Sequence, residues 1–231
     1  MNNSENKYHV SAVDGIILAL VLGSLWGLCE SVFGNVSRAA GIPFRGGMLT
    51  GIGMMLMGFG FGIMRRPLPA MFVALVAAAT MQLSVPVLHC SFLCKANSGL
   101  AVMLHGGMLA GCLSLYGRRR ARTSSGYALA GFSAAMLSSL VFYFAGMRLA
   151  PCAYLLSYNV DGGLVRFLFR EGAVWGAFSA LLLPAGVMAG SRAAAALYSW
   201  KIHRPGVMYG ASLASIAVCL LLIIVSIQHG M

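Results

Sequence analysis

The sequence predicts an all-α membrane protein, a polytopic helical bundle of about seven (six to seven) transmembrane helices. Apolar residues make up 59% of the chain and charged residues only 9%, which is unlike a soluble protein of this length. The apolar residues form long runs, and almost every charge lies between them. Each run is close to the roughly 20 helical residues that cross a hydrocarbon core about 30 Å thick. The runs lack the period-2 alternation of a membrane β-barrel, so only helices can satisfy their backbone groups in lipid.

Seven apolar runs define the expected elements. They cover residues 16–33, 48–64, 70–88, 100–116, 127–147, 173–190 and 207–227. Residues 1–13 form a polar N-terminal tail, and the whole chain, 1–231, is expected to be one integral-membrane domain. The first run is long and contains the ionisable Glu30, so we expect a retained helix and not a cleaved signal. The irregular stretch 151–172 is expected to end in a short helix that starts at Gly163 and continues into the sixth run.

The distribution of basic residues predicts the orientation. With the N-terminus in the cytoplasm, ten of the 16 Lys and Arg residues fall on cytoplasmic segments and six on outer segments. Blocks at the ends of runs, Arg65–Arg66 and residues 118–122, carry most of this bias, as the positive-inside rule requires. The sequence therefore predicts a multi-pass protein of the cell inner (plasma) membrane with a cytoplasmic N-terminus. Because the net charge of +11 lies in these short clusters, we expect no nucleic-acid partner.

Ionisable residues near the predicted outer side are candidates for a solute site. A charged side chain at membrane depth is costly and usually faces a bundle interior, a partner or a water-filled site. Glu30 lies about one turn from the outer end of the first run, and Arg38 and Arg45 follow it in the next loop. Glu30 is either a carboxylate that reaches the interface or pairs with one of these arginines, or a ligand for a solute or a coupling ion.

The stretch 151–172 supplies a second group of candidates. Arg166 and Arg170 are four residues apart and share one face of the expected short helix, so they could grip an anionic group together. The alternative is an interfacial helix whose arginines meet lipid phosphate or pair with nearby carboxylates. Further candidate polar side chains in this stretch are those of Tyr158, Asp161 and Glu171.

Cysteine and histidine residues cluster between the third and fourth runs. His89, Cys90 and Cys94 lie on the predicted outer side, and His105 follows inside the next run. These four side chains could complete a four-ligand metal site, although their spacing matches no common zinc pattern. Cys90 and Cys94 could instead form a local disulfide in an oxidising exterior, or remain two small hydrophobic residues.

Small residues recur every four positions in the first run, at Ala19, Gly23 and Gly27. Such a stripe lets another helix approach closely. It packs either against a helix of the same chain or against a separate membrane subunit. Glycines also crowd the second run and recur at Gly107 and Gly111 in the fourth.

Catalytic motifs are weak or absent. A histidine and a serine of the fourth and fifth runs stand in the order opposite to that of rhomboid proteases, and the serine motif lacks its final glycine. The chain has no phosphate-cradling Walker motif, no haem-attachment motif and no HExxH. We therefore expect no catalytic residue and identify no cofactor, and uphill transport would need an energy source elsewhere.

The stretch from Leu25 to Pro67 resembles part of a known family. It begins with Gly-x-Leu-Trp-Gly, contains Glu30, Gly34 and a loop with Pro43 and Gly46–Gly47, and exits through Arg65-Arg66-Pro67. This arrangement is similar to the substrate-binding S components of energy-coupling factor transporters, which usually have six spans. The resemblance implies that the stripe of Ala19, Gly23 and Gly27 faces a membrane coupling subunit associated with ATPases. It also implies that the loop 35–47 covers a vitamin-like or metal substrate.

The sequence thus favours a transport subunit in the lipid bilayer. We expect it to capture a small-molecule solute, vitamin-like, metal or anionic, in a cavity that opens to the outer face. The pocket would be mostly apolar with a few polar contacts, as ligand sites are. The alternative is a membrane-embedded enzyme or a redox- or metal-maturation protein that uses His89, Cys90, Cys94 and His105.

Overall fold

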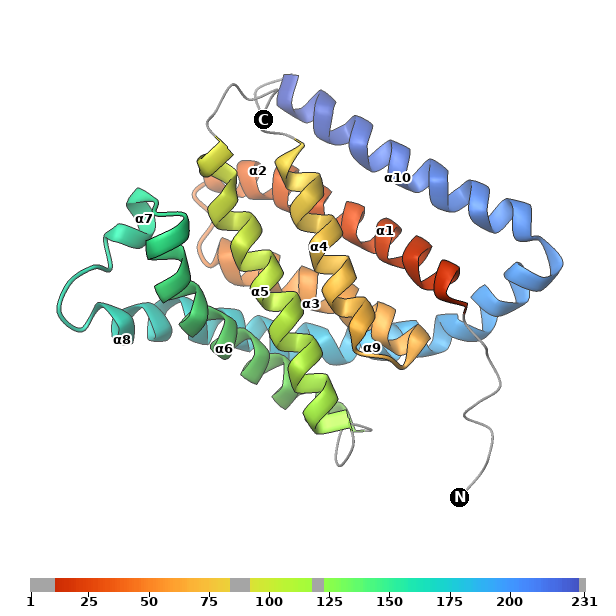
Figure 1. Cartoon of the computed structure of the whole chain (residues 1–231), viewed down its shortest axis with the longest axis horizontal. Helices are drawn as coiled ribbons and strands as arrows, with labels where there is room; N and C mark the ends of the chain where they lie inside the picture. The colour runs from red at the N-terminus through yellow and green to blue at the C-terminus, as the bar shows by residue number, and fades with distance from the viewer. Residues whose placement is uncertain (1–10, 84–91, 118–122, 229–231) are drawn as a thin grey trace.

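A computed structural model describes residues 11–83, 92–117 and 123–228 of the chain. These residues form α-helices and two short π-helical segments, and no strand occurs among them (Figure 1). Six of their helical stretches are long and apolar enough to cross a membrane, and a seventh apolar helix, α4, is shorter. The predicted all-α membrane bundle is therefore confirmed.

The elements follow the expected runs closely. In chain order they are α1 (Ala12–Leu28), η2 (Cys29–Phe33), α2 (Gly34–Ala39), α3 (Arg45–Met64), α4 (Leu68–Gln82), α5 (Phe92–Gly117), α6 (Ser124–Leu149), α7 (Ala153–Leu156), α8 (Gly163–Phe167), η3 (Leu168–Gly172), α9 (Ala173–His203) and α10 (Pro205–Gln228). The two π-helical segments, η2 and η3, continue α1 and precede α9 without a break in the helix.

Polar side chains set the starts of two long helices. At α1 a capping box forms, in which the Asp14 amide donates to Ser11 Oγ and the Ser11 amide donates to Asp14 Oδ2 at 2.9 Å. At α6 the amide of Gly126 donates to Thr123 Oγ1 at 3.2 Å. Such caps give hydrogen-bond partners to backbone N–H groups of the first turn, which have none within the helix, so both helices begin at a defined residue.

Helices α3 and α9 form the centre of the bundle and run parallel to each other. Gly47 of α3 lies against Val174, and Gly62 lies against Ser191, so residue numbers rise in the same direction along both helices. We call their contact surface the α3–α9 seam. The glycines that form it are Gly47, Gly51, Gly58 and Gly62 of α3 with Gly186 and Gly190 of α9. A Cβ atom on Gly186 or Gly190 would meet a backbone carbonyl of α3, so the two backbones are in direct contact.

The remaining helices pack around this pair. Helix α1 crosses α3 in the opposite direction, and α4 runs parallel to α1 along its glycine face. Helix α5 packs on α4, and α6 packs on both α5 and α9. The buried core contains large side chains from most of these helices, including Trp26, Met54, Met81, Leu109 and Leu183.

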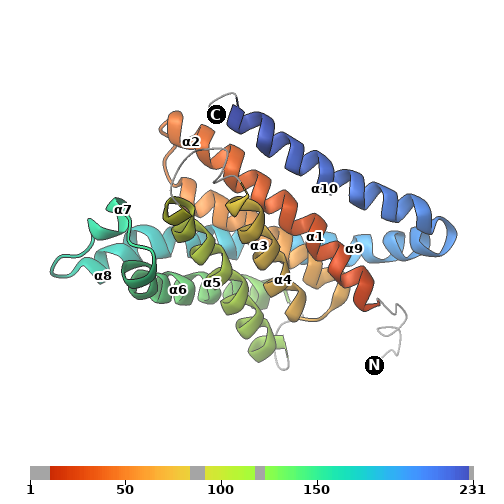
Figure 2. The same cartoon turned by 45° about the horizontal axis from the view of Figure 1, so that its top comes forward.

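Helix α10 lies apart from the centre. In both views it runs along the outer side of α1 and away from α5 and α6 (Figures 1 and 2). Only 11% of its most apolar window is buried inside the protein, against 67% for α3. Its buried positions, Cys219, Ile223 and Ser226, lie in its second half. Most of α10 therefore presents apolar side chains outward, as a helix in contact with lipid does.

The helix that contains α8, η3 and α9 is too long for a single span. It is continuous from Gly163 to His203, 41 residues, or roughly 60 Å at 1.5 Å per residue. A hydrocarbon core is about 30 Å thick, so this helix tilts or extends beyond it. We refer below to the two ends of the bundle as the Glu30 end, where α1 stops and α3 and α9 start, and the Asp14 end, where α1 starts and α9 stops.

Candidate functional site

The carboxylate of Glu30 lies in η2 and is held by a tryptophan one turn earlier. Trp26 Nε1 donates to Glu30 Oε1 at 3.2 Å. The Trp26 ring is 1% exposed and packs directly on Gly53 of α3, where any side chain would collide with it. This bond explains how a half-buried carboxylate is tolerated in an apolar helix, since its charge is met by an N–H donor.

A second carboxylate and tryptophan occupy the equivalent place on α9. Glu171 lies in η3, and Trp175 follows four residues later at the start of α9. Both side chains meet above Gly46, the second residue of α3. Trp175 Nε1 lies 3.0 Å, and Glu171 Oε2 lies 3.7 Å, from the position that a Cβ of Gly46 would take. The absence of a side chain at Gly46 therefore brings a donor and an acceptor to the same point.

Trp175 Nε1 differs from Trp26 Nε1 in its bonding. Trp175 is 7% exposed, and its N–H has no hydrogen-bond partner among the described residues. An unpaired buried N–H costs about 1–3 kcal/mol, so such a group calls for a partner. The most direct partner would be a polar atom of a bound molecule above Gly46.

His105 of α5 adds a second polar group beside the indole. Its ring centroid is 5.2 Å from that of Trp175. His105 Nδ1 lies 2.6 Å from the carbonyl oxygen of Ala101, which can only accept, so Nδ1 carries a proton. Nε2 is then an acceptor in the neutral ring, and it too is buried without a partner in the described part of the chain. We call Gly46, His105, Glu171 and Trp175 the Trp175 cluster.

Tyr154 of α7 donates to the Glu171 carboxylate from the surface side. Desolvation and hydrogen bonding to Glu171 and Tyr158 raise the pKa of the Tyr154 hydroxyl far above its ordinary value. The phenol therefore stays protonated and remains a donor.

Aromatic rings close the side of the cluster that faces α6 and α8. The rings of Phe142 and Phe167 lie 5.9 and 6.0 Å from that of Trp175. The Tyr143 hydroxyl donates to the carbonyl oxygen of Tyr158 at 3.0 Å, which fixes the loop before α8 against α6. The wall thus joins helices α6, α8 and α9 with the loop between them, and Tyr158, a predicted site residue, belongs to it.

The other residues predicted for a solute site do not join the Trp175 cluster. Arg45, Asp161, Arg166 and Arg170 are all exposed. Arg38 lies in α2, and its side chain is outside the description. Arg166 and Arg170 share an outward face. The polar groups of the buried cluster come instead from Glu171 and from other helices, which the spacing of the two arginines does not predict. An anionic solute held by arginines inside the bundle is not what this arrangement favours.

The stripe of Ala19, Gly23 and Gly27 packs inside the chain. A Cβ on Gly23 would lie 2.7 Å from the carbonyl oxygen of Val73, and one on Gly27 would lie 2.7 Å from Thr80 Cβ. The two glycines of the stripe are therefore covered by α4, and docking of a coupling subunit on the stripe stays a prediction that this contact disfavours. The small residues serve the intrachain contact that was the other interpretation.

The predicted metal or redox group is only partly visible. His89 and Cys90 lie outside the described residues, and so does the side chain of Cys94. In the parts of the chain that the structure describes, no three potential ligands lie close enough to hold a metal. The cysteines described with their side chains, Cys29, Cys112, Cys152 and Cys219, are free thiols.

No protein-family model, no curated protein and no solved structure matches this chain. The function of the chain is therefore inferred from its own residues. Sequence reasoning missed Trp175 and Gly46, the two residues on which the buried cluster depends. One signal was present: Trp26 and Glu30, and likewise Glu171 and Trp175, are spaced four apart, which places each pair on one helix face.

Proposed function

We propose that this chain is the solute-binding subunit of a membrane transporter and that the solute binds at the Trp175 cluster. The observation that carries the proposal is the unpartnered indole N–H of Trp175, which meets the Glu171 carboxylate above Gly46. Ligand sites in membrane bundles combine an apolar wall with a few convergent polar groups at membrane depth. The aromatic wall and the cluster have this composition.

The cluster favours a solute that donates hydrogen bonds. It offers two acceptors, the Glu171 carboxylate and His105 Nε2, and one donor, Trp175 Nε1–H. A carboxylate beside aromatic rings suits an amine or another small organic cation, because the rings and the charge both attract it. A vitamin-like solute with a planar ring and an amino group would also fit. We expect a separate subunit to supply energy, since the sequence has no nucleotide-binding motif.

Small molecules that copurify with the protein test this proposal. The wild-type protein and the variants Trp175→Phe and Glu171→Gln would be purified in the same detergent, and their extracts compared by mass spectrometry. Trp200→Phe is the matched control, because Trp200 is 59% exposed and lies near the opposite end of α9. We expect one or more compounds to be retained by wild type and Trp200→Phe and depleted in both cluster variants.

The affinity of each variant for the identified compound then measures how much each side chain contributes to binding. Removing the neutral indole bond should weaken binding by about 1 kcal/mol, and removing the charge of Glu171 by about 1.5–3 kcal/mol, as measured by calorimetry with the identified compound. Retention of the same compounds by Trp175→Phe and Glu171→Gln would show that the cluster is structural. Loss of the compounds with Arg166→Ala alone would place the site at the exposed arginines instead.

A further inference from the structure

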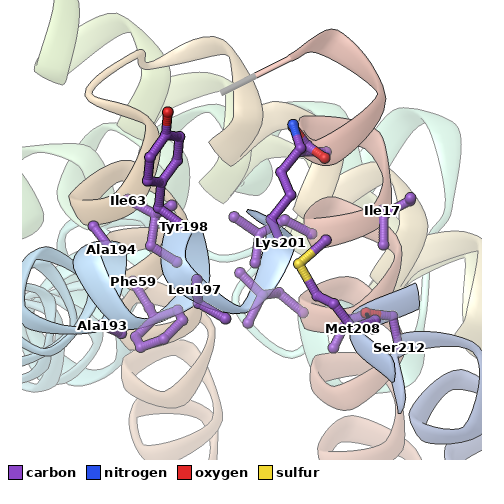
Figure 3. Close-up of a pocket in the computed structure, with 14 residues that line it drawn as sticks. Ile17, Phe59, Ile63, Ala193, Ala194, Leu197, Tyr198, Lys201, Met208 and Ser212 are labelled. Atoms are coloured by element: carbon purple, nitrogen blue, oxygen red, sulfur yellow. Dashed lines mark hydrogen bonds and ion pairs between the residues drawn. The ribbon is translucent and has the colours of Figure 1, made fainter. Parts of the chain in front are cut away.

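A cavity of about 290 Å³ lies at the Asp14 end, far along the bundle from the Trp175 cluster (Figure 3). Helices α1, α3, α9 and α10 surround it. Its wall is almost entirely aliphatic and aromatic, with Ile17, Phe59, Leu197 and Met208 among the lining residues. Its volume is at the lower limit of ligand pockets, so the cavity suits a slender apolar group better than a large solute.

Polar contacts tie α10 to α1 and α9 beside the cavity. Lys201 of α9 donates to Asp14 Oδ2 at 2.5 Å, and the Tyr209 hydroxyl of α10 donates to Asp14 Oδ1 at 3.2 Å. One carboxylate therefore joins three helices. Beyond this latch, Ala193 and Ala194 of α9 are too small to reach the facing wall, and space remains between the helices.

The chemistry of the wall limits what can fill this space. A buried water needs two to four polar partners, and the only polar lining groups are Asp14, Tyr198, Lys201 and Ser212. Asp14 and Lys201 already bond to each other, and Ser212 donates to the carbonyl oxygen of Met208. The rest of the wall can gain only apolar contacts. In a bilayer the abundant apolar group of suitable width is an acyl chain.

The charged residues around the cavity indicate which kind of lipid headgroup would accompany the acyl chain. The Asp14 end carries exposed arginines: Arg65 follows the last turn of α3, and Arg204 follows α9, three residues after the lining residue Lys201. Arg192 is also exposed, but a helix turns about 100° per residue, so it lies on the face of α9 opposite the lining residues. Against these charges the described residues of this end supply one carboxylate, Asp14, which Lys201 neutralises. Basic pockets between membrane helices bind anionic lipid headgroups in this way.

We propose that the cavity binds one acyl chain of an anionic phospholipid whose phosphate lies at the Asp14 end of the bundle, near Arg204. The lipid fills the gap between α10 and the bundle and serves as a structural ligand. The site is independent of the solute site, since the two lie on different parts of α9. A hydrophobic transport solute or the tail of any lipid would be the competing occupant.

Native mass spectrometry with two lipids of identical tails tests the proposal. The full chain would be purified, depleted of lipid, and mixed with palmitoyl-oleoyl phosphatidylglycerol or with the corresponding phosphatidylcholine. We expect one phosphatidylglycerol to be retained per chain with at least a fivefold preference over phosphatidylcholine. Arg204→Gln should lose this preference while still folding, since its side chain is exposed, and Arg192→Gln, on the opposite face of α9, should keep it.

A variant that fills the cavity tests the chain-binding part. Ala194→Phe places a ring in the cavity and should reduce phosphatidylglycerol retention at least fivefold. Ala196→Phe is the control, because Ala196 is exposed on the same helix and does not line the cavity. If Ala194→Phe does not fold, Arg204→Gln decides alone. Equal retention of both lipids by wild type, or unchanged selectivity in Arg204→Gln, would overturn the proposal.

Discussion

Helices α3 and α9 meet along glycines, whereas α10 meets the bundle through the Tyr209 hydroxyl, a cavity and the buried positions of its second half. In the α3–α9 seam Gly186 and Gly190 touch the backbone of α3, and side chains of α9 lie directly on the glycines of α3, so van der Waals contact is continuous. At α10 the hydrogen bond to Asp14 fixes the first half of the helix, and the cavity separates the apolar side chains of α10 from those of the bundle. The comparison teaches that a membrane helix can be positioned by missing side chains or by polar contacts, and only the second leaves space for a ligand.

The largest expected effect is at the seam. Gly186→Leu would push a side chain into the backbone carbonyl of Met55, which cannot move without displacing α3. We expect a loss of about 3 kcal/mol or more in the free energy of unfolding, measured by denaturant titration in detergent. A stable Gly186→Leu protein with an unchanged helix content would mean that the seam is not a direct backbone contact.

A smaller effect is expected where α1 meets α4. Gly27→Leu would collide with the side chain of Thr80, but the nearest carbonyl, that of Ala77, is 3.2 Å from the position of the new Cβ. Side-chain rearrangement can absorb part of this clash, so we expect a loss of about 1–3 kcal/mol. The measurement is thermal unfolding of the purified chain alone. Full stability alone, combined with loss of a copurifying subunit, would restore the docking interpretation of the stripe.

A still smaller effect is expected at the latch. Asp14→Asn removes the charge that holds Lys201 and weakens the acceptor for Tyr209, while an Asn still bonds and caps. A partly exposed ion pair contributes about 0.2–1 kcal/mol, so global stability should change by less than about 1 kcal/mol. Hydrogen exchange should rise in α10 and not in α3 or in the part of α9 that forms the seam. Equal increases in all three helices would erase the contrast between the seam and the latch.

The smallest effect is expected on α5. Gly107 and Gly111 have the spacing of a packing stripe, yet no atom lies within 4 Å of a Cβ added to either residue. Gly107→Leu should therefore change the free energy of unfolding by less than about 0.5 kcal/mol, or raise it slightly, because leucine is the better helix former. A strong destabilisation would show that another molecule covers this face in the protein as purified.

The sequence predicted the helices better than it predicted their contacts. Run composition located every long helix, because the bilayer requires the same length of apolar residues in any fold. The contacts of a glycine stripe are different: Gly27 and Gly107 each have another glycine four residues away, yet Gly27 meets α4 and Gly107 meets no described residue. Only the arrangement of the other helices separates the two cases.

The candidate site was predictable in part. Glu30 and Glu171 were selected because a carboxylate in an apolar helix is costly. Both are half-buried in helical segments at the Glu30 end of the bundle, and each lies one turn from a tryptophan. The arginines were selected by their charge and, for Arg166 and Arg170, by their spacing on one helix face. Long cationic side chains extend toward water from almost any helix position, so their spacing says little about a buried site. Contact between His105 and Trp175 joins α5 to α9 and leaves no trace in sequence spacing.

The seam also has a consequence for the time course of synthesis. About 125 residues separate Gly62 from its partner Val187, which at roughly 5–20 residues per second is on the order of ten seconds of translation. During this interval α3 has entered the bilayer with its glycine face against lipid, because the helix that covers it has not been made. The interval between the two insertions is thus a stage at which the nascent protein depends on other helices, or on the insertion machinery, to protect an exposed backbone.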